Sequence, residues 1–152
     1  MRLIVRQPTL DELPKLSELC LRSKAVWGYD QAFIDACRDE LTLHPSDLAQ
    51  THIAVVEDSN GMAGVAQISA REHEADLLKL FVDPSMLRKG IGKFLFSWAC
   101  EQARNMRASR LFIEADPDAA QFYRRMGAYD IGFAPSGSIR GRKLPRLAFD
   151  LC

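Results

Sequence analysis

A hairpin signal in the middle of the chain constrains the fold most strongly. Two apolar runs, HIAVVED at 52–58 and MAGVAQISAR at 62–71, flank the turn SNG at 59–61. Asn and Gly tolerate the positive φ that a tight turn between antiparallel strands requires. ADLLKLFV at 75–82 follows as a third strand. The sequence therefore predicts an antiparallel sheet at the centre of the molecule.

Helix-like and strand-like segments alternate around this hairpin. From the spacing of apolar residues we expect strands at 3–5, 110–115, 128–133 and 143–151, and helices at 9–27, 31–41, 91–106 and 117–126. The predicted fold class is mixed α/β, with a mostly antiparallel central sheet flanked by helices. Because the chain has 152 residues and no linker-like segment, we expect a single domain, 1–152.

The composition narrows the classes of function. Twenty Lys and Arg balance twenty Asp and Glu, which argues against a nucleic-acid partner. No apolar stretch approaches the ~20 residues of a membrane span, and the N-terminal apolar run is too short for a secretory signal. We therefore expect a cytoplasmic protein with no membrane partner. The four cysteines lack CxxC spacing and the three histidines are scattered, so we expect free thiols and no metal.

The segment LRKGIGKFLFSWAC at 87–100 places two glycines directly before a helix-like pattern. A phosphate can accept hydrogen bonds from the free N–H groups of a first helical turn, and glycines let it come close. The pattern GxxxxGK[ST] is absent, and GxGxxG would need glycine where Leu95 stands. By itself the segment predicts either a phosphate loop or a glycine turn before a core helix.

Two segments together resemble the core motifs of the GNAT N-acetyltransferases: LLKLFVDPSMLRKGIGKFLFSWA and DPDAAQFYRRMGA. The matching positions are Val82, Asp83, Pro84, Gly90 and Gly92 in the first segment and Ala119, Tyr123 and Gly127 in the second. Two positions depart from the family's pattern, because Leu87 replaces Gln or Arg and Asp116 replaces Asn. We interpret Asp116 as a helix cap.

The resemblance implies the GNAT acyl-CoA N-acyltransferase fold and an enzyme that moves an acetyl group from acetyl-CoA to a primary amine by direct attack. It implies that the pyrophosphate lies on the amides of residues 88–93 and that the pantetheine arm runs beside residues 80–82. The implied cofactor-binding residues are Leu80, Phe81, Val82, Arg88, Lys89, Gly90, Ile91, Gly92, Lys93 and Phe122. Tyr123 is implied as the catalytic group that hydrogen-bonds to the departing CoA thiolate. Homodimers are common in this family, and a homodimer is therefore an assembly to test.

The remaining candidates concern the acceptor, a small-molecule or peptide amine. An alkyl amine of pKa ~10 is mostly protonated at neutral pH, so a base is needed. Glu74 and Asp76 are our catalytic candidates for that base, acting through water; a solvated hairpin end is the alternative. Trp27 and Tyr29 lie where the family builds its acceptor pocket, although core packing fits Trp27 equally well. The loop PSGSIRGRK at 135–143, with Ser136, Arg140 and Arg142, could bind an acidic acceptor or the CoA 3′-phosphate; a solvated hairpin loop is the alternative.

Two alternatives from other functional classes stay open. A non-catalytic acyl-CoA-binding sensor would bind CoA without transferring acetyl to any amine. A nucleotide-binding module would be protected against heat better by ATP or NAD than by acetyl-CoA. The sequence does not name the amine.

Overall fold

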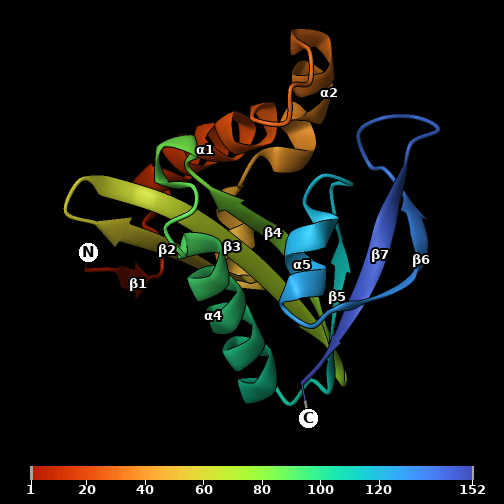
Figure 1. Cartoon of the computed structure of the whole chain (residues 1–152). Helices are drawn as coiled ribbons and strands as arrows, with labels where there is room; N and C mark the ends of the chain where they lie inside the picture. Colours follow the sequence, from red (N-terminus) through yellow and green to blue (C-terminus); the bar gives the residue numbers. More distant parts are fainter. Residues whose placement is uncertain (1, 152) are drawn as a thin grey trace.

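A seven-stranded sheet forms the centre of the molecule (Figure 1). The computed structural model describes residues 2–151. The strands are β1 (Ile4–Arg6), β2 (His52–Asp58), β3 (Gly61–Arg71), β4 (Glu74–Val82), β5 (Arg110–Glu114), β6 (Tyr129–Pro135) and β7 (Lys143–Asp150), in the spatial order β1-β2-β3-β4-β5-β7-β6. All neighbouring strands are antiparallel except the parallel pair β4 and β5. The expected mixed α/β class with a mostly antiparallel sheet is confirmed.

Helices cover both faces of this sheet (Figure 1). Helices α1 (Leu13–Ala25) and α2 (Gln31–Leu41) bury their apolar residues against β2 and β3, with Leu16, Leu19 and Val55 in one cluster. Helices α4 (Ile91–Asn105) and α5 (Ala120–Arg125) pack on the opposite face. Because each helix repeats apolar residues at helical spacing, each presents one continuous stripe to the sheet. No helix within residues 2–151 has the length and apolarity needed to cross a bilayer.

One short helix, α3 (Pro45–Gln50), was not predicted from the sequence. Residues 42–51 break the apolar pattern of the preceding helix and read as a loop. The helix forms locally instead: Pro45 occupies its first turn, and the Asp47 carboxylate accepts a hydrogen bond of 2.8 Å from the His44 N–H. Capping rather than apolar periodicity therefore builds this element.

Two predicted helix starts are also shifted. The first helix was expected from Thr9, but residues 10–12 form a 3-10 turn and α1 begins at Leu13. The last helix was expected from 117 but begins at Ala120, because Asp116 accepts a hydrogen bond of 2.9 Å from the Asp118 N–H and caps a turn there. Gly127, at φ +107°, ends this helix as expected.

Strands β4 and β5 diverge after four paired residues. Their pairing runs from Glu74 opposite Arg110 to Leu77 opposite Ile113 and then stops. A bulge in β4 at Leu78 breaks the register with β3 at this point. Residues 79–82 therefore pair with β3 alone, Leu78 has no partner in either neighbouring strand, and the main chain of residues 78–82 is unpaired on the β5 side. We call the opening between residues 78–82 and the end of β5 the β4–β5 wedge.

Gly64 in β3 allows helix α4 to lie against the sheet at the top of this wedge. A Cβ at this position would lie 2.9 Å from Leu95 Cδ1, 3.0 Å from the Phe81 carbonyl oxygen and 3.1 Å from Ile91 Cγ2. Real Cβ atoms do not approach so closely, so only glycine fits without a shift of main chain. The close approach positions the first turn of α4 beside β4.

Candidate active site

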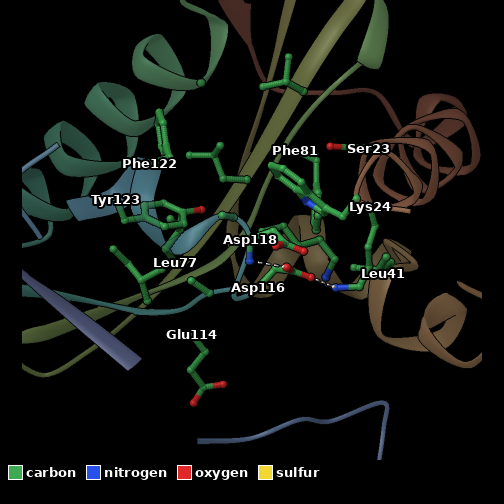
Figure 2. A pocket seen from close by; sticks show the side chains of 18 of the residues that line it. Ser23, Lys24, Leu41, Leu77, Phe81, Glu114, Asp116, Asp118, Phe122 and Tyr123 are labelled. Carbon is green, nitrogen blue, oxygen red and sulfur yellow. Dashed lines mark hydrogen bonds and ion pairs between the residues drawn. The ribbon is translucent and has the colours of Figure 1, made fainter. Parts of the chain in front are cut away.

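A cavity of about 690 Å³ occupies the β4–β5 wedge (Figure 2). One end, which we call the α4 end, is lined by Val82, the loop 88–93 and residues Phe122 and Tyr123 of α5. The other, the α2 end, is lined from α1, α2 and the β6–β7 loop, residues 136–142. The cavity therefore passes through the sheet from one helical layer to the other.

The loop at the α4 end presents free main-chain donors. Within residues 2–151, the N–H groups of residues 88–93 donate no intramolecular hydrogen bond. Gly90 precedes α4 with φ +82°, and Arg88 also has a positive φ of 62°, so the chain turns sharply around this point. Free N–H groups at the positive end of a fifteen-residue helix form an anion site. Arg88 and Lys93 also line the cavity.

The edge of β4 offers a second set of main-chain groups. Leu80, Phe81 and Val82 line the cavity, and their strand is unpaired on the β5 side. An extended ligand with amide groups can hydrogen-bond to such an edge as a further strand would. Gly92 keeps the adjoining wall open, because a Cβ there would lie 3.4 Å from the Phe122 ring.

Tyr123 is the polar group that faces the centre of the cavity. Its side chain is 6% exposed, and its hydroxyl, which points into the cavity in Figure 2, has no hydrogen-bond partner within residues 2–151. The rings of Phe96 and Phe122, with centroids 5.9 Å and 5.1 Å away, hold the phenol in place. Burial raises the pKa of Tyr123 well above its ordinary value. The hydroxyl therefore stays protonated and is available as a donor.

A polar cluster closes the α2 end. Asp116 accepts hydrogen bonds from the Tyr29 hydroxyl at 2.8 Å and from Lys24 Nζ at 3.1 Å. Arg142 Nη2 donates to the Tyr29 hydroxyl at 2.6 Å and lies 3.5 Å from Asp116. The Tyr29 ring stacks on Phe33 with centroids 4.0 Å apart. These contacts join α1, the α1–α2 connection, the turn after β5 and the β6–β7 loop.

The contacts of the cluster shift the pKa values of Asp116 and Tyr29. Burial opposes ionisation of Asp116, but hydrogen bonds from the Asp118 N–H, Tyr29 and Lys24 outweigh it, so the pKa of this carboxyl lies below its ordinary value. Burial and the neighbouring carboxylate raise the pKa of Tyr29 to about 12. At neutral pH the cluster therefore holds one anion, two cations and a neutral phenol.

A second cavity of about 330 Å³ opens between β4, β5 and β7 and the end of α2. The residues that line both cavities are Glu40, Leu77, Leu78, Glu114 and Leu144. Of the two shared carboxylates, Glu40 accepts a hydrogen bond from the Ser138 hydroxyl, whereas Glu114 takes no hydrogen bond or ion pair from residues 2–151. In Figure 2 Glu114 lies apart from the Asp116 cluster. The two cavities meet at an unpaired carboxylate.

Most residues expected at the site line the main cavity. They are Trp27, Leu80, Phe81, Val82, Arg88, Gly90, Ile91, Gly92, Lys93, Phe122, Tyr123 and Ser136. Trp27 is 46% exposed, so it forms part of the wall rather than the core. Tyr29 lies behind the wall, bonded to Asp116, which is the centre of a cluster as well as a cap. Lys89 and Arg140 are exposed and do not line the cavity.

Glu74 and Asp76, expected as bases, lie away from Tyr123. Arg71 binds both carboxylates, at 3.4 Å and 2.8 Å, near the turn between β3 and β4. Asp76 lines the second cavity only, and Glu74 lines neither. The structure thus brings neither side chain to the main cavity, because the first residues of β4 lie at the opposite end of the strand from the wedge.

Several cavity residues were not found by sequence reasoning, namely Lys24, Glu40, Lys79 and Glu114. Lys79 and Glu114 could have been found from the sequence, because each is a charged residue that interrupts an apolar strand run. The positions of Lys24 and Glu40 at the cavity depend on contacts between distant segments. Cys20, Cys37 and Cys100 are buried free thiols, as expected, and Cys152 lies outside the described residues. Residues 2–151 contain no group of three His, Cys, Asp or Glu side chains that could hold a metal.

Comparison with known proteins places this geometry in context. The family model of the Acetyltransferase (GNAT) family matches residues 15–128. No curated protein matches the chain. A GCN5-related N-acetyltransferase from Rhodopseudomonas palustris is 16% identical, with 97% of this chain and 94% of that chain covered and a TM-score of 0.80. The PaiA N-acetyltransferase from Thermoplasma acidophilum, solved with coenzyme A, is 17% identical, with 99% of both chains covered and a TM-score of 0.78. The ribosomal-protein-S18-alanine N-acetyltransferase from Escherichia coli is 15% identical, with 99% of this chain and 94% of that chain covered and a TM-score of 0.72.

Proposed function

Because the chain belongs to the GNAT acetyltransferase family, we propose that it transfers an acetyl group from acetyl-CoA to a primary amine by direct attack of the amine on the thioester. The observation that carries the proposal is the unpaired hydroxyl of the largely buried Tyr123 side chain, which points into a cavity that also contains free main-chain donors. A hydroxyl held in this way is a donor prepared for a ligand atom that develops charge.

Donor binding is proposed at the α4 end. The N–H groups of residues 88–93 would bind the CoA pyrophosphate, with charge from Arg88 and Lys93. The pantetheine amides would pair with the unpaired edge of residues 80–82. The positive φ at Gly90 and the open wall at Gly92 fit this role, since both leave room for a phosphate to reach the main chain. The Thermoplasma protein was solved in complex with coenzyme A, which supports an acyl-CoA as the donor.

The proposed chemistry is one displacement. The amine nitrogen attacks the thioester carbonyl, a C–N bond forms, and the C–S bond breaks to release CoA thiolate. Main-chain N–H groups near Val82 polarise the carbonyl, and the Tyr123 hydroxyl hydrogen-bonds to the thiolate. The ordinary pKa of a tyrosine already exceeds that of a thiol, and burial raises the pKa of Tyr123 further, so donation of a hydrogen bond is favoured over complete proton transfer.

We assign acceptance of the amine proton to Glu114, through water. Glu114 replaces Glu74 and Asp76 in this role because it lines both cavities and has no ion-pair partner within residues 2–151, whereas Arg71 holds the other two carboxylates. The amine, as a small molecule or a peptide, would enter through the second cavity while the donor occupies the α4 end. Both substrates can then be bound together, so no covalent enzyme intermediate is required.

The test is release of free thiol from acetyl-CoA in a panel of primary amines. We expect Tyr123→Phe to lower kcat by roughly 10- to 100-fold, the effect of losing one hydrogen bond to a charged atom, with acetyl-CoA affinity unchanged. Tyr129→Phe is the matched control, since Tyr129 is exposed and bonds Asp150 on the far edge of the sheet.

Three outcomes would contradict parts of the proposal. Unchanged turnover in Tyr123→Phe would remove the role of this residue. Binding of CoA without transfer to any amine would indicate an acyl-CoA sensor. Stronger thermal protection by ATP or NAD than by acetyl-CoA would indicate a nucleotide-binding module.

A further inference from the structure

Lys79 is a partly buried cation at the α2 end of the cavity whose role the proposed chemistry does not use. It belongs to β4, next to the bulge at Leu78, and its side chain lines the cavity on the sheet face that carries α1 and α2. No carboxylate of residues 2–151 lies within 4.0 Å of its ammonium group. An ammonium group withdrawn from water is costly unless a partner compensates it.

A chain of hydrogen bonds holds this ammonium group in position. Lys79 Nζ donates to Gln67 Oε1 at 3.1 Å. Gln67 is 1% exposed, and its Nε2 donates to the Thr51 hydroxyl at 3.0 Å, which in turn donates to the Asp47 carbonyl oxygen. The amide oxygen of Gln67 is therefore fixed towards Lys79. It uses one of the three N–H bonds of the ammonium group, and two remain for a ligand.

Apart from the carboxylates of Glu114 and Asp118, the other charges near the α2 end already have partners within residues 2–151. Lys24 and Arg142 share Asp116, as described above. Glu40 accepts the Ser138 hydroxyl, and the Asp47 carboxylate accepts the His44 N–H. Lys79 is thus the cation at this end that has only a neutral partner. An anionic group on a bound ligand would supply the missing charge.

The position of Lys79 relative to Glu114 suggests which ligand carries that group. The last paired residues of β4 and β5 are Leu77 and Ile113, so Lys79 and Glu114 lie just beyond the pairing, on the two sides of the wedge. If the amine nitrogen of the acceptor is held near Glu114, a substituent on the carbon next to that nitrogen would lie towards Lys79. Leu41, Leu78 and Leu144 supply apolar walls around them.

We propose that Lys79 binds a carboxylate carried by the acceptor, so that the acceptor is an amino-acid-like amine with an apolar body. This inference rests on the proposed acetyl transfer and specifies its substrate class. A charge-assisted hydrogen bond contributes roughly 10- to 100-fold in binding, which sets the size of the effect to look for.

The experiment compares amines that differ only at the carboxylate. L-phenylalanine, its amide and phenethylamine are assayed with acetyl-CoA, together with the phosphonate analogue of phenylalanine, which separates a carboxylate from any other anion. We expect kcat/KM for phenylalanine to exceed that for the amide and for phenethylamine by at least about tenfold. Lys79→Met should abolish this preference by lowering kcat/KM for phenylalanine to that for its amide, and Lys79→Arg should retain part of it. Lys15→Met, at an exposed position of α1, is the matched control.

The outcomes separate this inference from the proposed function. Transfer to all the amines with equal kcat/KM would overturn the inference and leave the acetyltransferase assignment standing. Loss of acetyl-CoA affinity in Lys79→Met would place Lys79 in donor binding and would also overturn it. Ligands with and without the carboxylate can also be compared without turnover. For this, the products N-acetyl-L-phenylalanine and N-acetylphenethylamine are titrated into the protein in the presence of CoA, and their affinities are measured. Equal affinity for the two products would refute a carboxylate site even where no amine is acetylated.

Discussion

Asp116→Asn tests whether the cluster at the α2 end stabilises the fold by charge. Asparagine has nearly the same shape, and its single amide oxygen at the Oδ1 position can still accept from the Asp118 N–H and the Tyr29 hydroxyl, so the substitution removes mainly the negative charge. It leaves Lys24 and Arg142, whose side chains are only 14% and 18% exposed, without their counter-ion.

The expected loss follows from these contacts. A charge-assisted hydrogen bond contributes about 1.5–3 kcal/mol, and breaking a fully buried ion pair costs about 3–5 kcal/mol. Because the cluster borders a cavity that water can enter, we expect Asp116→Asn to lower the free energy of unfolding by about 2 kcal/mol at pH 7. For a domain of this size that corresponds to a decrease of roughly 4–8 °C in Tm.

The effect should depend on pH in one direction. The pKa of Asp116 is lower in the folded protein than in the unfolded chain, so its stabilisation is complete above the unfolded value, near about 4. It is lost as the pH falls through the folded value. The difference between the wild type and Asp116→Asn should therefore be largest at neutral pH and shrink below about pH 4.

The assay is urea unfolding followed by circular dichroism between pH 3 and pH 7. Glu18→Gln is the control, because Glu18 pairs with Arg38 on the surface, where ion pairs contribute about 0–1 kcal/mol. A loss at pH 7 no larger than that of Glu18→Gln would refute the reasoning. So would a difference of undiminished size at pH 3.

Two further substitutions test the fold and the chemistry. Gly64→Ala should lower the free energy of unfolding by about 1–3 kcal/mol, because the new Cβ meets the Phe81 carbonyl oxygen, which cannot move freely. The measurement is urea unfolding, and an unchanged urea midpoint would contradict the close packing of α4 on β3. Glu114→Gln should lower kcat for amine acetylation by about 100-fold or more and make the rate less dependent on pH. Equal rates in Glu114→Gln and in the control Glu101→Gln, on the exposed side of α4, would exclude Glu114 as the base.

The features that the sequence predicted correctly are local ones. The hairpin at 59–61, the glycines before α4 and the end of α5 at Gly127 each depend on a few adjacent residues whose conformational preferences point the same way. Tyr123 was expected at the site from the family resemblance, and its side chain lines the cavity. Helix α3 was missed because six residues with capping but no apolar stripe give no periodic signal.

The parts of the site that could not be predicted depend on distant partners. The bond between Lys24 and Asp116 joins residues 92 positions apart, and the bond between Arg142 and Tyr29 spans 113 positions. Because side chains alternate between the two faces of a strand, the sequence correctly placed Glu74 and Asp76 on the same face of β4. The alternation does not tell which end of the strand borders a cavity. That depends on where the pairing with β5 stops, which no local pattern of β4 encodes.

The short pairing between β4 and β5 has a mechanical consequence. Strands β1–β4 and strands β5–β7 form two halves of the sheet, joined directly by four residue pairs at one end. From Leu77 to Val82 the free arm of β4 is ~16 Å long, so a rotation of about 5° at the joint moves its tip by ~1.4 Å, a large fraction of a hydrogen-bond length. The ion pair of Lys24 with Asp116 spans the open end and limits this rotation. Substitutions at Ala75 or Leu111, a pair of the joint that lines neither cavity, should therefore alter ligand affinity by changing the angle between the halves.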